Sequence, residues 1–221
     1  MTDAGVAEDN EVSVVDAVSW LQEEGLARLA ALGEATGPAA AFTVDVNSGL
    51  VIMFPATNKD SSSCGADELP APIETTGRLV TVGVTTSAAL LVVDLSGSLM
   101  IAVNGDRPEL ATRFWALQLL LNPDITLTTN SGEVAIGSSS RCKKSFIPGG
   151  GGAIISVDDG RPPVTTVSMN SAMDGADYLE LAPDGSGEMY LGPRFWQLDH
   201  VLTIADEPWS ALASALEGAD R

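Results

Sequence analysis

The segment from Arg78 to Pro123 constrains the fold most, because it sets three apolar runs directly before one long apolar stretch. The runs read RLVTVGV, AALLVVDL and LMIAV, and their β-branched residues favour strands. The stretch PELATRFWALQLLLN follows, with Pro108 near its start and Asn122-Pro123 at its end, a pattern typical of a helix with defined ends. The segment therefore predicts three strands and then a helix.

That helix is predicted to be buried, because its apolar residues go most of the way around it. Phe114 and Leu117 are expected to anchor it in the core. The runs DITLTT and AIISVDD predict further strands, so that strand, helix and strand make a β-α-β unit. The predicted fold class is α/β (α+β): a mixed β-sheet with a β-α-β core and flanking helices, rich in hairpins.

The rest of the chain adds helices and hairpins to this core. Apolar residues at helical spacing predict a helix over Glu11–Leu32, and the run AAFTVDVNSGLVIMF predicts two strands around a turn. Near the end, DYLELAPDGSGEMYLG predicts a hairpin, WQLDHVLTI a strand and DEPWSALASALEGA a closing helix. Residues 1–10 are predicted to be a disordered tail and 11–221 a single domain, with the polar segment 56–77 as a candidate internal boundary.

The charge of the chain limits its partners, because the net charge is -19 and the isoelectric point is near 4.1. Such a surface repels nucleic acid and anionic lipid and favours basic proteins. The predicted partners are other proteins, with self-assembly as one route, and neither nucleic acid nor membrane. Few lysines, with abundant Ala, Gly, Asp and Val, indicate high-GC coding, as in actinobacteria or their phages, or a salt-loving host.

The N-terminus MTDAGVAEDNE is acidic and lacks the apolar segment of a signal peptide. No apolar run reaches the roughly 18 residues of a membrane span. The expected location is the cytoplasm, or a virion assembled there.

Few side chains offer site chemistry. The single histidine, His200, disfavours histidine-based catalysis and zinc binding, and no cofactor is predicted. Cys64 and Cys142 are compatible with one disulfide or with two reduced thiols. The adjacent carboxylates Asp158 and Asp159 offer an acid and a base, or only a solvated strand end.

The octet GDRPELAT (Gly105–Thr112) has the length of a phosphate-binding loop, G-x4-G-K-[ST], and matches it only at the first and last positions. Leu110 stands where a glycine would let backbone amides surround the phosphates, and Ala111 stands where a lysine would supply charge. This hypothesis is therefore the weakest of three, a degenerate P-loop-like domain without nucleotide hydrolysis.

The pentapeptide DLSGS has the Asp-x-Ser-x-Ser spacing of a metal-ion-dependent adhesion site, with Asp94, Ser96 and Ser98 as the candidate ligands. With the apolar run before it, LLVVDLSGSLM resembles the first motif of von Willebrand factor A domains. That resemblance implies a metal-dependent adhesion-type binding domain. However, Asp158 follows Asp94 too closely for the elements which that family places between them. The alternative is a Ser/Gly turn that joins two strands.

A second resemblance covers under half of the chain. The residues Val92–Leu95, Leu99–Gly105, Asp106 and Leu110–Leu121, together with Tyr178–Ala219, resemble the soluble module of large actinobacterial membrane proteins. Those proteins also carry LysM peptidoglycan-binding or bacterial transcriptional-activator (BTAD-type) domains, and this chain has neither. The resemblance implies a strand hairpin that leads into an apolar helix, and a high-GC host. It supplies no catalytic residues.

The sequence thus predicts a non-enzymatic protein-binding adaptor or structural component of a larger assembly, of the virion or secretion-apparatus type. The metal-dependent domain with Asp94, Ser96 and Ser98 is the alternative. The loop 137–152 is locally basic through Arg141, Lys143 and Lys144. It is predicted to be mobile, and to be either a solvated loop or a contact between copies of the chain.

Overall fold

The computed structural model describes residues 12–57, 59–137, 139–147, 152–171 and 177–219. Its strands are β1 Ala39–Asp45, β2 Leu50–Pro55, β3 Ser62–Gly65, β4 Leu79–Thr85, β5 Ala89–Asp94, β6 Met100–Asn104, β7 Thr126–Thr129, β8 Cys142–Lys144, β9 Ala153–Asp158, β10 Thr165–Met169, β11 Asp177–Leu181, β12 Gly187–Leu191 and β13 Arg194–Val201. They form one 13-stranded mixed sheet in the order β3-β2-β1-β5-β4-β13-β12-β11-β6-β10-β9-β7-β8. The predicted α/β class with a mixed sheet is confirmed.

The helices are α1 Val14–Trp20, α2 Leu26–Thr36, α3 Pro108–Leu121 and α4 Asp206–Ala219, and a π-helical turn, Leu21–Gly25, joins the first two. A capping box begins α1: Ser13 Oγ accepts from the Asp16 amide at 3.2 Å, and Asp16 Oδ2 accepts from the Ser13 amide at 3.1 Å. At Gly25 an added Cβ would come within 2.8 Å of the Trp20 ring, so a larger residue there would have to displace that ring.

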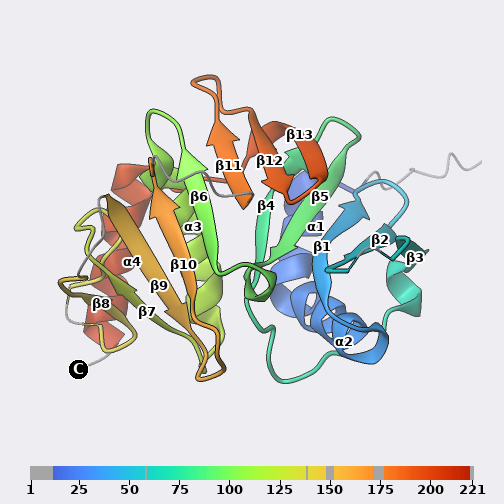
Figure 1. Ribbon diagram of the computed structural model, residues 1–221, viewed down its shortest axis with the longest axis horizontal. Coiled ribbons are helices and arrows are strands. Elements are labelled where there is room, and N and C mark those ends of the chain that lie inside the picture. Colours follow the sequence, from blue (N-terminus) through green and yellow to red (C-terminus); the bar gives the residue numbers. More distant parts are fainter. Residues whose placement is uncertain (1–11, 58, 138, 148–151, 172–176, 220–221) are drawn as a thin grey trace, which may run out of the picture.

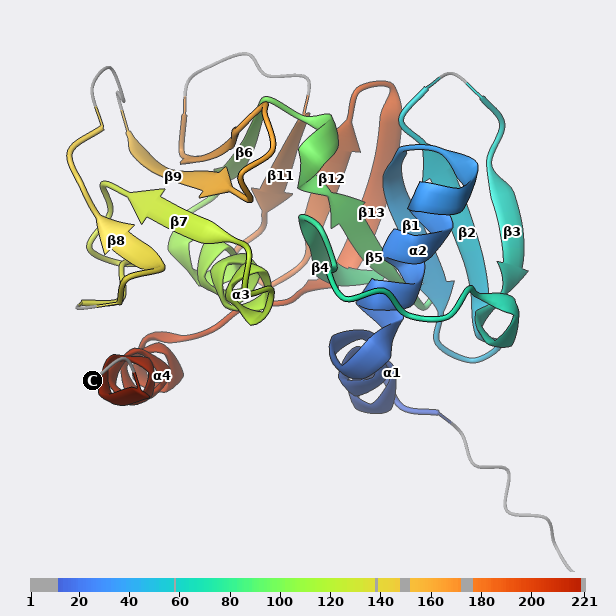
Figure 2. The ribbon, with the colours of Figure 1, turned by 90° about the horizontal axis from the view of Figure 1, so that it is seen from below.

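Helices α1 and α2 lie beside β1–β5, and α3 and α4 lie beside β6–β10 (Figures 1 and 2). Strand β6 is parallel to β10, and β9 is antiparallel to both β10 and β7. Strands β6 and β7 therefore run in the same direction and form the predicted β-α-β unit with α3. Phe54 of β2 and Trp196 of β13 stack edge to face with ring centroids 5.2 Å apart, although β1, β5 and β4 separate these strands. The sheet therefore curls between them.

Two apolar cores form on the two faces of β5. Leu90 and Val92 belong to the core beneath α1 and α2, whereas Leu91 and Val93 belong to the core that contains α3. Because both faces are buried, the run ALLVV is apolar throughout rather than alternating with polar residues.

Eight of the 14 residues of helix α3 are buried and five are half-buried, so the helix is largely buried, as predicted. Its largest fully buried side chain is Trp115, and Leu121 at its end is 62% exposed. The predicted anchors Phe114 and Leu117 are partly buried and pack against the same core. Trp115 is therefore the main anchor, because the helix turns that residue, rather than its neighbour, into the core.

Both edge strands come from segments that the sequence indicated as loops. β3 lies within 56–77 and pairs with β2, and β8 lies within 137–152 and pairs with β7. Cys64 is on β3 and Cys142 on β8, at opposite edges of the sheet, and both thiols are free. The predicted tail, 1–10, lies outside the described residues. Among the helices of the described ranges, none combines the length and apolarity needed to cross a membrane.

Candidate functional site

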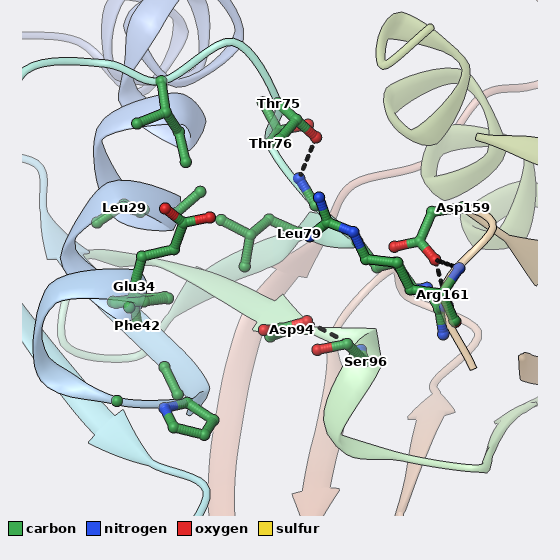
Figure 3. A pocket seen from close by; sticks show the side chains of 18 of the residues that line it. Leu29, Glu34, Phe42, Thr75, Thr76, Leu79, Asp94, Ser96, Asp159 and Arg161 are labelled. Atoms are coloured by element: carbon green, nitrogen blue, oxygen red, sulfur yellow. Dashed lines mark hydrogen bonds and ion pairs between the residues drawn. The ribbon is translucent and has the colours of Figure 1, made fainter. Parts of the chain in front are cut away.

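A groove of about 510 Å³ opens beside helix α2 (Figure 3). Four segments form it: α2 with the start of β1, the residues that lead into β4, the 3-10 turn Leu95–Gly97 after β5, and the turn 159–163 between β9 and β10. Apolar lining residues include Leu29, Ala30, Phe42, Ile73 and Leu79. Polar lining residues include Glu34, Thr75, Thr76, Asp94, Ser96, Asp159 and Arg161.

The buried cation Arg78 holds the polar wall together, and only 2% of its side chain is exposed. Its Nη1 donates to the Pro163 carbonyl at 2.6 Å and to Thr165 Oγ1 at 3.0 Å. Its Nη2 donates to Asp159 Oδ1 at 2.5 Å and to the Arg161 carbonyl at 2.6 Å. Because Arg78 directly precedes β4, one guanidinium fixes the turn 159–163 to the centre of the sheet.

The same network sets the charge of Asp159. Burial raises the pKa of this carboxyl, but the hydrogen bonds from Arg78 and from the Arg161 amide outweigh burial, and its pKa lies below the ordinary value. Asp159 is therefore ionised near neutral pH and is poorly suited to donate a proton. Its neighbour Asp158 accepts the Gly160 amide at 2.8 Å. In this structure the two candidate acid–base carboxylates shape a turn.

No hollow of the described residues is lined by all three candidate metal ligands. Asp94 Oδ1 accepts the Ser96 amide at 2.9 Å, and both residues line the groove. Ser98 is buried, lines a second hollow that Asp94 also borders but Ser96 does not, and donates to Asp177. The chain continues after Ser98 into β6, and the 3-10 turn directs the second serine away from the first. The described part of the chain contains no group of three or more His, Cys, Asp or Glu side chains arranged to hold a metal ion.

The residues of the P-loop-like octet are also engaged within the protein. Thr112, which stands where such a loop presents a hydroxyl to Mg²⁺, is fully buried and donates to the Pro108 carbonyl at 2.6 Å. Arg107 donates to Asp206 Oδ1 at 2.8 Å and to Glu109 Oε1 at 2.8 Å. The start of α3 therefore docks α4 through Asp206.

The basic loop is less free than its sequence indicates. Arg141 donates through its guanidinium to the backbone carbonyls of Asn122 and Ile125, which closes the connection between α3 and β7. Lys143 and Lys144 are exposed on the edge strand β8. Only these two lysines remain available, among the three predicted cations, as a contact for another molecule.

The walls of the groove differ in chemistry, and Figure 3 shows Leu29 and Phe42 on the side of α2 and Asp159 and Arg161 across from them. Arg161 is exposed, and within the described residues its guanidinium makes no ion pair. Gly33 of α2 leaves space, because a Cβ there would approach only the Phe42 ring, at 4.0 Å. Such a groove suits an extended chain with apolar side chains on one edge and polar groups on the other.

Sequence reasoning identified Asp94, Ser96 and Asp159 but not Arg78, which organises the wall. In the sequence, Arg78 is marked only as the arginine that opens the apolar run RLVTVGV. Because a charged residue at the start of a strand is usually solvated, this position does not indicate a buried cation. No protein-family model, curated protein or solved structure matches the chain. The geometry of the groove therefore carries the functional argument.

Proposed function

We propose that this protein is a non-enzymatic protein-binding adaptor, or a structural component of a larger assembly, and that the groove accepts an extended segment of its partner. The observation that carries the proposal is a groove with an apolar wall on α2 and a polar wall fixed by the buried Arg78. A fixed wall lowers the entropic cost of binding, because little has to be ordered when the partner arrives.

The groove also indicates what kind of segment it takes. Apolar side chains of the partner would cover the accessible apolar lining residues Ala30, Pro38 and Ile73, where burial of apolar area favours binding. Polar groups of its backbone would meet the hydroxyl groups of Thr76 and Ser96 and the guanidinium of Arg161. The protein's overall negative charge supports partners with a basic surface, because it accelerates their encounter.

The test fills the groove without disturbing the fold. Gly33→Trp places a large ring in the groove, and Gly33→Ala is the matched control, since its methyl group leaves most of the space open. Linear peptides selected from a display library against the native protein are the probes. We expect Gly33→Trp to weaken their binding by about tenfold or more, a loss of about 1.4 kcal/mol, and Gly33→Ala to preserve it. Selected peptides that bind both variants equally would contradict the proposal.

A further inference from the structure

A row of aromatic rings crosses strands β11, β12 and β13. Tyr178 and Tyr190 are directly paired and stack with ring centroids 4.5 Å apart. Tyr190 and Phe195 are paired on the next two strands, with centroids 4.9 Å apart. The alternate residues Leu179 and Met189 are buried in the core, so the row lies on the opposite, outer face. Phe195 is 49% exposed.

A second row, of acidic and amide side chains, runs beside the aromatic row on the same face. Its members lie two residues after Tyr178 on β11, two residues before Tyr190 on β12 and two residues after Phe195 on β13. Glu180 is paired with Glu188, and Glu188 with Gln197. Like charges directly opposite each other on neighbouring strands destabilise a sheet. The ion pairs among the described residues involve neither glutamate. The free protein therefore holds two opposed carboxylates without a cation between them.

One tyrosine connects the two rows. The Tyr190 hydroxyl donates to Glu188 Oε2 at 2.9 Å, and this bond raises the pKa of Tyr190 to about 12. The hydroxyl therefore stays protonated near neutral pH, and it holds Glu188 in place beside the aromatic ring. The hydrogen bond leaves the charge of the carboxylate in place.

We propose that this aromatic–acidic face binds an arginine-bearing segment of a partner protein, at a site separate from the groove. A guanidinium is planar, stacks on aromatic rings and pairs with carboxylates, so one arginine satisfies both rows. A cation between Glu180 and Glu188 would also relieve their repulsion. Charge complementarity identifies the partner, because the chain carries a net charge of -19. Neutral ligands that stack on rings, such as a sugar or a proline-rich peptide, would leave the two glutamates opposed.

Glu180→Gln gives the sharpest test, because it removes one charge and leaves the bond between Tyr190 and Glu188 intact. The probes are a flexible Gly/Ser peptide with two arginines and the same peptide with citrulline, which keeps the shape but not the charge. We expect the arginine peptide to shift the ring resonances of Tyr178, Tyr190 and Phe195. We also expect Glu180→Gln to weaken that binding several-fold while raising the melting temperature, a combination that a purely structural glutamate would not give.

Phe195→Ser should weaken the same binding, and Phe146→Ser is its matched control, since Phe146 is 86% exposed on a different part of the molecule. Equal binding of the citrulline peptide would overturn the proposal in favour of a neutral ligand. Resonance shifts spread over the whole acidic surface, or equal losses in both phenylalanine variants, would also overturn it. Because Gly33→Trp leaves this face intact, failure of the groove proposal and failure of this one are separate results.

Discussion

Replacing Arg78 with methionine tests whether one buried cation fixes the polar wall of the groove. Methionine keeps an unbranched apolar stem but removes four hydrogen bonds, two of them to the carbonyl oxygens of Arg161 and Pro163. It also leaves Asp159, whose side chain is only 12% exposed, without its cation. Removing one partner of a buried ion pair typically costs about 3–5 kcal/mol, and we expect Arg78→Met to lose that much. The free energy of unfolding of a typical domain is only about 5–15 kcal/mol.

The assay is urea unfolding, followed by circular dichroism, with the free energy extrapolated to water. Arg161→Met is the control, because it removes an exposed arginine from the same turn and should change stability by less than about 0.5 kcal/mol. In the double variant Arg78→Met/Asp159→Asn, the loss of unfolding free energy should differ from the sum of the two single losses by about 0.5–3 kcal/mol. A loss below about 1 kcal/mol for Arg78→Met, or strictly additive losses, would refute the role given to this side chain.

Three further predictions follow from particular contacts. Gly33→Ala should stabilise the protein by about 0.5–1 kcal/mol, since alanine favours a helix. Gly25→Ala should destabilise it by about 1–3 kcal/mol, because the added methyl group collides with the Trp20 ring. Urea unfolding of both variants checks that the two changes in stability have opposite signs. The stability that Asp159 contributes through its lowered pKa is present above its ordinary pKa of 3.8 and is lost as the pH falls through the lower folded value, so Asp159→Asn should flatten stability measured across that acidic range. If copies associate through Lys143 and Lys144, replacing both with serine should reduce the mass measured by light scattering at low salt, and an unchanged mass would exclude that contact.

The elements that the sequence predicted well are those whose pattern is local. Pro108 marks the start of α3, and the strands β11 and β12 flank a turn at Pro183-Asp184-Gly185, as their sequence indicates. β10 was not predicted, because its sequence TTVSM contains one short apolar alternation and depends on β6 and β9 for its pairing. The edge strands β3 and β8 were interpreted as loops for the same reason, since their Ser, Gly and Lys residues carry little strand preference.

Both proposed surfaces depend on contacts between residues far apart in the sequence. Arg78 reaches Asp159 only because the turn after β9 packs against the start of β4. The aromatic row requires the register of three strands, since neither Tyr178 nor Phe195 belongs to a local motif that would indicate a stack. Composition alone suggested basic partners but gave no position for them.

One short segment of the chain links the groove to the aromatic–acidic face. The turn Leu95–Gly97 presents Ser96 to the groove, and the next residue, Ser98, donates to Asp177, which begins β11 just before Tyr178. Substitutions within this turn would therefore act on both surfaces at once and would not separate them. Gly33 and Glu180 lie outside this segment, on α2 and towards the far end of β11. Loss of binding in Gly33→Trp therefore reports on the groove, and loss of binding in Glu180→Gln reports on the aromatic–acidic face. An adaptor with two independent partners should lose one partner in each variant.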